Sequence, residues 1–209
     1  MVTAVSEITA KQVSDLRKAT GAGMMDAKRA LEETGGDVAR AKDLLREKGL
    51  ASAKKRTGRV TTQGSIGSYL HYQADRPVIG VIVELASETD FVAKNAEFQA
   101  AANDVAMHIA WARPRWVRRE EVPEELLAKE RELIAAQARN EGKPDKAIDK
   151  IVEGRINAFY QDNVLYDQVF MNSEKFDGTV GEMVEGLAAQ MGENITVSRI
   201  ARIGVGEAE

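Results

Sequence analysis

An apolar run over residues 78–85, followed at once by a polar junction and a helical pattern, is the feature that most constrains the fold. The run is short and rich in β-branched residues, which predicts a strand. Beyond it, apolar residues recur on one helical face, and they predict a helix that begins at Asp90 and ends before Pro114. Residues 87–95 therefore form a strand-to-helix junction, with Thr89 or Asp90 as the N-cap.

Phe91, in the first turn of this predicted helix, has two interpretations. In the first, it begins an apolar stripe that continues at Phe98 and Val105, and its ring is buried in the core. In the second, the ring projects from an exposed corner as an apolar wedge beside the carboxylate of Asp90. Helical periodicity is the same in both cases and does not separate them, although local sequence alone favours the buried ring.

Two further segments complete a small antiparallel sheet. Residues 64–72 alternate between apolar and other side chains, and residues 73–77 form a turn into the 78–85 strand, which predicts a hairpin. Residues 195–203 alternate in the same way and supply a third strand. The predicted fold class is therefore α+β, with this sheet packed on the helix that begins at Asp90.

The alternation also assigns faces to the first of these strands. Ile66, Leu70 and Tyr72 share one face, and the half-buried pattern predicts that this face packs on the core. His71 lies on the opposite face from Leu70 and Tyr72. Its side chain is therefore expected at the surface.

The first fifty residues predict a bundle of three short helices. Thr9 and Gln12 form a capping box for the first helix, and residues 24–33 form the second. Asp37 caps the third helix, which Gly49 is expected to end. A bundle of this size is close to the smallest that folds alone, so its core has to be economical.

Met24 and Met25 begin the second helix of this bundle. Adjacent helical positions diverge by about 100°, so the two side chains cannot both point into one small core. In one interpretation, Met24 covers the end of the bundle and Met25 fills its core. In the other, the pair contributes an adaptable apolar docking patch at the surface.

These patterns divide the chain into an N-terminal bundle at 1–50, a basic linker at 51–62 and a core domain at 63–209. Within the core domain, two helices joined by a Gly and Pro turn predict an antiparallel helical hairpin over about 122–162. The basic residues of the linker include Lys54, Lys55 and Arg56. A short basic run is most often a solvated connection, and the alternative is contact with RNA or an acidic partner.

Composition excludes several functions. A net charge of −4 and an isoelectric point near 5.5 argue against general binding to nucleic-acid backbones. The chain has no cysteine and only two histidines, His71 and His108, which excludes disulfides and leaves most histidine-based catalytic or metal sites without enough members. Neither a membrane-spanning apolar run nor a secretory signal is recognisable, and we expect a cytoplasmic protein.

Motifs for catalysis are also missing from the sequence. It contains no phosphate-binding glycine loop of the Walker or dinucleotide type. Paired carboxylates occur at Glu120, Glu121, Glu124 and Glu125, but on an exposed charged segment, where general acid–base chemistry lacks the burial that it needs. We therefore expect no catalytic residues, no bound metal and no cofactor. A hydrolase that uses these carboxylates is a weaker alternative.

Two segments, LRKATGAGMMD at 16–26 and ETDFVAKN at 88–95, resemble the signatures of the bacterial-type translation elongation factor Ts family. Shorter matches occur in order at 80–85, 142–144, 152–155 and 192–195. The resemblance implies a ubiquitin-associated-like bundle, a core of strands packed on helices, and a protruding helical hairpin. It also implies a guanine-nucleotide exchange factor, not an enzyme, which binds elongation factor Tu in its GDP form and promotes exchange of GDP for GTP.

The resemblance implies a role for the junction as well. Thr89, Asp90, Phe91 and Val92 match the family segment that inserts beside the partner's nucleotide and perturbs its magnesium and phosphate site. In that role the ring of Phe91 is exposed. The resemblance therefore favours the second interpretation of this residue.

Other positions match the family's docking residues. Arg17, Met24 and Met25 correspond to residues that dock on the GTP-binding domain of elongation factor Tu, and His71 lies where the sheet is expected to touch another domain of that partner. The chain has one copy of the strand hairpin where many relatives have a duplicated core, so it resembles a short form that is expected to form a homodimer. No direct contact with nucleic acid is required. An RNA-associated adaptor that uses the basic linker is the alternative from a different class.

Overall fold

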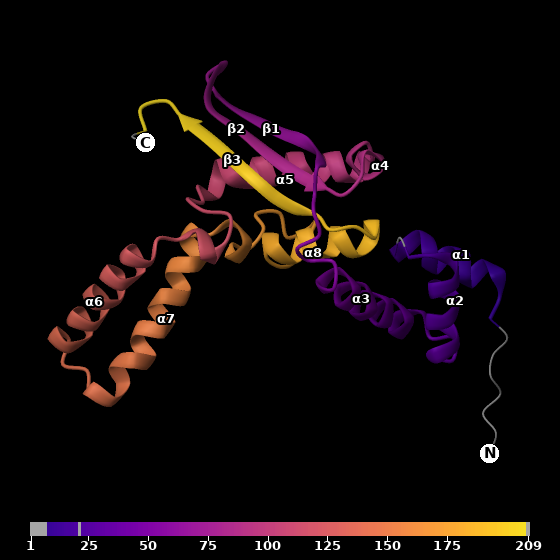
Figure 1. Cartoon of the computed structure of the whole chain (residues 1–209), viewed down its shortest axis with the longest axis horizontal. Coiled ribbons are helices and arrows are strands. Elements are labelled where there is room, and N and C mark those ends of the chain that lie inside the picture. The colour runs from indigo at the N-terminus through magenta and orange to yellow at the C-terminus, as the bar shows by residue number, and fades with distance from the viewer. Residues whose placement is uncertain (1–7, 21, 208–209) are drawn as a thin grey trace. The chain divides into compact units, whose positions relative to one another are not determined.

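The computed structural model describes residues 8–20 and 22–207 (Figure 1). Within them the chain has eight α-helices and three strands, which confirms the predicted α+β class. The chain divides into two compact units. The first contains the described residues up to 64 together with 86–93 and 184–196, and the second contains 65–85, 94–183 and the residues from 197 onward.

Three N-terminal helices form a bundle, as predicted: α1 (Ala10–Thr20), α2 (Met24–Glu33) and α3 (Val38–Lys54). The predicted capping box is present, because the Thr9 N–H donates to Gln12 Oε1 at 2.9 Å and the Gln12 N–H donates to Thr9 Oγ1 at 3.2 Å. Small and medium apolar side chains fill the core. Those buried in it are Val13, Leu16, Ala27, Ala30, Leu31 and Ala41.

Helix α3 is longer than the sequence predicts. Asp37 caps it as expected, since its side chain accepts two first-turn N–H groups, but the helix passes Gly49 and continues to Lys54. The prediction that Gly49 ends the helix was wrong because this glycine serves packing. A Cβ at residue 49 would lie only 3.2 Å from Ala189 Cβ of helix α8 (Val180–Met191). The division of the chain at residues 50 and 62 stays a prediction.

The three predicted strands form one antiparallel sheet, in the order β1 (Gln63–Gln73), β2 (Arg76–Ser87) and β3 (Thr196–Gly204). Helix α5 (Ala96–Ala112) lies along one face of this sheet (Figure 1). The Ser68 N–H of β1 donates to a side-chain amide of α5 at 3.0 Å. The predicted sheet and its supporting helix are thus confirmed.

The faces of β1 are the reverse of the prediction. Gly67 is buried, whereas the apolar residues expected in the core are exposed. A Cβ at residue 67 would lie 2.1 Å from the carbonyl oxygen of Ala102, so only glycine allows the strand and α5 to approach this closely. The exposed apolar residues of the outer sheet face are Ile66, Leu70, Tyr72, Ile82 and Ile203. Alternation separates the two faces of a strand, but it does not identify the face that meets the helix.

Helices α6 (Glu124–Asn140) and α7 (Asp145–Asn163) form the predicted helical hairpin. Gly142, at a φ of +73°, occupies the turn between them. On the exposed side, Arg131 pairs with Glu153 at 2.5 Å. The buried core of the hairpin consists of Ile134, Ala138, Ile148, Val152 and Ile156.

His108 of α5 is buried in the second unit and hydrogen-bonded at both ring nitrogens. Its Nδ1 accepts the Met171 N–H at 3.2 Å, which leaves Nε2 as the protonated nitrogen, 3.1 Å from Gln168 Oε1. The amide of Gln168 is fixed in turn, because its Nε2 donates to the carbonyl oxygen of Asp162 at 3.0 Å. Burial lowers the pKa of His108, so the folded chain holds the neutral imidazole.

We expect Gly67→Ala to destabilise the second unit by about 3 kcal/mol, because the added methyl group overlaps the backbone of α5. Gly154→Ala is the matched control. Residue 154 lies within α7, and apart from its chain neighbours and the backbone of its own helix, nothing lies within 4 Å of the place of a Cβ, so this change should stabilise the unit by about 0.5–1 kcal/mol. Urea unfolding followed by the fluorescence of Trp111 and Trp116 measures both. Equal stability of the two variants would contradict the close approach.

The neutral His108 predicts a loss of stability in acid. Unfolding returns its pKa to the ordinary value of 6.5, so the unfolded chain binds more protons, and the free energy of unfolding falls as the pH decreases from 6.5 toward the lower folded pKa. The slope from this residue is at most about 1.4 kcal/mol per pH unit. Urea unfolding across this pH range should show the slope in the exposed-site control His71→Gln and not in His108→Gln. The same slope in both variants would refute the assignment.

Candidate functional site

Helix α4 (Asp90–Ala93) is a single turn that presents Phe91 to solvent. Phe91 is 82% exposed, whereas Val92 and Ala93 are buried. The interpretation that places Phe91 in the core was therefore wrong. The ring projects into solvent from this short turn, which follows the end of β2.

A helix break explains this outcome. The sequence predicts one helix from Asp90, but the structure ends α4 at Ala93 and begins α5 at Ala96. Asn95 starts the second helix, because its side chain accepts the Glu97 N–H at 2.8 Å. The predicted stripe is buried from Phe98 onward, whereas Phe91 belongs to the separate turn α4 and is exposed.

The sequence allows Thr89 or Asp90 as the N-cap of α4, and the structure shows that it is Thr89. Its carbonyl oxygen accepts the Ala93 N–H at 3.2 Å, and its Oγ1 lies 3.4 Å from the Val92 nitrogen. The Ser87 hydroxyl also donates to the Thr89 carbonyl oxygen, at 3.0 Å. Local hydrogen bonds therefore set the first turn.

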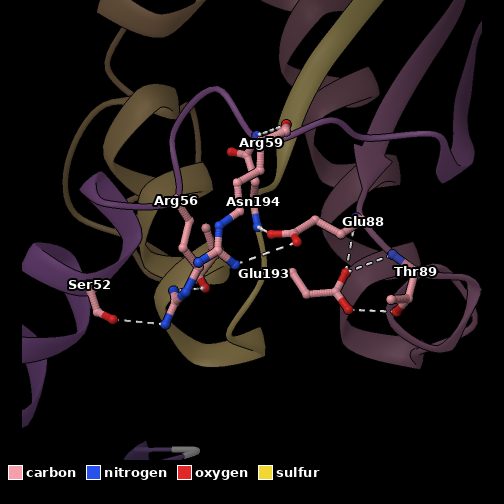
Figure 2. Close-up of polar contacts among 8 residues, drawn as sticks. Ser52, Arg56, Arg59, Glu88, Thr89, Glu193 and Asn194 are labelled. Atoms are coloured by element: carbon pink, nitrogen blue, oxygen red, sulfur yellow. Dashed lines mark hydrogen bonds and ion pairs between the residues drawn. The ribbon is translucent and has the colours of Figure 1, made fainter.

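A carboxylate from a distant part of the sequence holds the backbone in front of this turn (Figure 2). The N–H groups of Glu88 and Thr89 both donate to Glu193 Oε2, each at 3.0 Å. The Thr89 hydroxyl donates to the other carboxylate oxygen, Oε1, at 2.5 Å. One side chain thus accepts three hydrogen bonds from two consecutive residues.

Residues near the end of β2 and in the linker also bind the turn that carries Glu193 (Figure 2). The Asn194 N–H donates to Glu88 Oε1 at 2.6 Å, and Asn194 Nδ2 donates to the carbonyl oxygen of Arg59 at 2.7 Å. The guanidinium of Arg59 lies 3.6 Å from Glu88 Oε2. We call Arg59, Glu88, Glu193 and Asn194 the polar clamp. All four residues and Phe91 belong to the first unit.

The other predicted site residues are exposed. Met24 and Met25, at the start of α2, are 50% and 58% exposed, so the interpretation in which Met25 fills the core was wrong. Arg17 on α1 is exposed as well. His71 is exposed near the end of β1, as predicted, and its Nδ1 lies 3.4 Å from Tyr69 Oη. The docking roles of these four residues stay predictions.

Reasoning from the sequence missed the polar clamp. Glu193 and Thr89 are 104 positions apart in the sequence, so no helical or strand period connects them. The one signal was the match of residues 192–195 to the family pattern, which assigns them no role. Capping chemistry was visible at Thr89, but its long-range acceptor was not.

Two alternative sites lose support in the structure. Glu120, Glu121, Glu124 and Glu125 are all exposed, which removes the burial that a hydrolase would require. In the basic linker, Arg56 is half-buried and donates to Ser52 Oγ at 2.9 Å (Figure 2), so it is already engaged within the chain. Among the described residues, no group of three or more His, Cys, Asp or Glu side chains is arranged to hold a metal ion.

Fold and site together define an α+β protein that carries an exposed aromatic residue on a hydrogen-bonded corner. In the described ranges, no helix has the length and apolar character needed to cross a bilayer.

Residues 2–207 match the sequence profile of the family Elongation factor TS. The protein named Elongation factor Ts from Geobacter sulfurreducens is 52% identical over 96% of this chain and 90% of its own length. That from Thermosipho melanesiensis is 48% identical over 96% of this chain and 100% of its own. The chain is thus a translation elongation factor. It belongs to the elongation factor Ts family.

Proposed function

We propose that this chain is a cytoplasmic guanine-nucleotide exchange factor that binds elongation factor Tu in its GDP form and promotes the release of GDP, so that GTP can load. The observation that carries the proposal is Phe91, an exposed apolar ring in the turn that begins at Asp90. A large exposed aromatic residue at a defined position is typical of an interface anchor. The chain performs no reaction of its own in this proposal and holds no cofactor.

Differential binding explains how such a protein accelerates release. A factor that prefers the nucleotide-free partner weakens the partner's affinity for GDP, and GDP weakens the affinity for the factor by the same ratio. We place residues 89–92 beside the partner's magnesium and phosphate site. The magnesium ion is a large local charge that holds the phosphates, so displacement of this ion by a small wedge has a large effect on nucleotide affinity.

We propose that both the N-terminal bundle and the core domain contribute residues to the remaining docking surface. The bundle at 1–50 contributes Arg17, Met24 and Met25, whose exposed thioether side chains adapt readily to an apolar partner surface. The linker at 51–62 connects it to the core domain at 63–209, which contributes His71. The two methionines lie on α2 without filling the bundle core, which supports a role at the surface.

Phe91→Ala should slow the release of fluorescent GDP from elongation factor Tu by about thirtyfold at saturating factor, which corresponds to about 2 kcal/mol. Because the ring is exposed, the same change should alter the free energy of unfolding by no more than about 0.5 kcal/mol. Trp111→Ala, which removes another exposed aromatic ring, is the matched control and should leave release unchanged. A Phe91→Ala chain as fast as wild type would remove the proposed role of the ring.

We further propose that the chain forms a homodimer through the outer sheet face. The apolar residues on this face come from all three strands, and the opposite face is occupied by α5. Two antiparallel sheets pack face to face when their facing side chains are apolar. A twofold axis would place the same patch on both copies, so each copy would cover the other's face.

Substitution of the central residues of this face tests the dimer. Leu70→Glu together with Ile82→Glu should convert a dimer to a monomer in analytical ultracentrifugation, because buried carboxylates would face one another across the axis. Glu182→Ala, elsewhere on the second unit, should leave the mass unchanged. A wild-type chain that is monomeric at every concentration would contradict the proposal. In that case, reduced affinity of the double variant for elongation factor Tu would assign the face to that partner.

A further inference from the structure

We propose that Glu193 is a positioning residue for nucleotide exchange: it fixes the backbone from which Phe91 projects. The inference rests on the proposed function and adds a residue to which neither the sequence patterns nor the comparisons assign a role. Glu193 itself need not touch the partner. Its effect passes through Thr89 to the first turn of α4.

The geometry of the carboxylate supports this role. Its Oε2 accepts the two consecutive N–H groups of Glu88 and Thr89 at 3.0 Å each, and its Oε1 accepts the Thr89 hydroxyl at 2.5 Å. Three donors from two residues define both the position and the rotation of this backbone segment. A single N-cap bond would leave the rotation unspecified. Hydrogen bonds to a charged acceptor are also stronger than neutral ones.

The turn that carries Glu193 is itself well anchored. Helix α8 ends at Met191, and Gly192, at a φ of +75°, donates its N–H to the Ala188 carbonyl oxygen at 3.0 Å. Ile195, two residues after Glu193, is buried. Glu193 therefore stands between a helix end and a buried residue, where its side chain can serve as a fixed reference for the Phe91 corner.

The ring, by contrast, has little packing to hold it. Phe91 is 82% exposed, so the backbone beneath it sets the direction of the ring. Once the other residues have docked, only complexes in which the ring points in the productive direction can insert it without reordering, so a lower fraction of such complexes lowers the maximal rate of GDP release in proportion. The polar clamp raises that fraction.

Glu193→Ala and Glu193→Gln separate positioning from bulk stability. Alanine removes both acceptor oxygens and with them all three hydrogen bonds. Glutamine keeps the geometry, because its Oε1 can accept the two N–H groups while its Nε2 donates to the Thr89 hydroxyl. The matched control is Glu182→Ala, since Glu182 Oε2 accepts the Thr179 N–H at 2.8 Å in a similar cap on the second unit.

We expect Glu193→Ala to lower the maximal rate of GDP release at saturating factor about tenfold, equal to about 1.4 kcal/mol. The factor concentration that gives half the maximal rate should change by less than about threefold, because the other docking residues are untouched. Glu193→Gln should restore most of the rate. Glu182→Ala should keep the full rate, whatever it does to the unfolding free energy.

A double variant tests the route of the effect. If Glu193 acts through Phe91, then adding Glu193→Ala to Phe91→Ala should cause almost no further loss. Additive losses, or a Glu193→Ala chain with the wild-type maximal rate, would overturn the role of Glu193 while Phe91→Ala still supports exchange. A wild-type chain that does not accelerate release would overturn the proposed function and this inference with it.

Discussion

An exposed aromatic ring cannot be fixed by packing, and in this chain hydrogen bonds to one carboxylate fix the backbone beneath it. Phe91 is 82% exposed, yet the two residues that lead into its turn donate three hydrogen bonds to Glu193. Because only Gly192 separates Glu193 from the end of α8, the direction of the ring depends on where that helix ends. The direction of the Phe91 ring thus depends on α8, which lies about a hundred residues further along the sequence.

In the second unit, the packing of the sheet on α5 depends on Gly67, which has no side chain. Gly67 brings β1 so close to α5 that even a methyl group would overlap the Ala102 carbonyl oxygen. With Gly67 on the face of β1 that meets α5, Leu70 lies on the opposite face and is exposed. The close contact with the helix and the apolar outer sheet face are therefore two results of one packing arrangement.

Local chemistry predicted most elements of this fold, since capping boxes and alternation are short-range signals. The Thr9 capping box, the strand hairpin and the start of α4 at Asp90 were all correct. Errors arose where packing decided the outcome, as for the side of β1 that meets α5 and for Gly49, which lies against Ala189 without ending its helix. At the site, the exposure of Phe91 followed from the family resemblance and not from periodicity, and the contact with Glu193 was beyond any local pattern.

The polar clamp orients the corner more than it stabilises the chain. The ion pair between Arg59 and Glu88 spans 3.6 Å with the Arg59 side chain 53% exposed, and exposed pairs of this kind contribute about 0–1 kcal/mol. Thr89 is exposed and Glu88 is half-buried, so water can replace the Glu193 carboxylate at their N–H groups when that side chain is removed. Water, however, does not impose a direction on the backbone, whereas an anchored carboxylate does. A contact with a small effect on unfolding can therefore have a large effect on the fraction of chains whose ring is ready to bind.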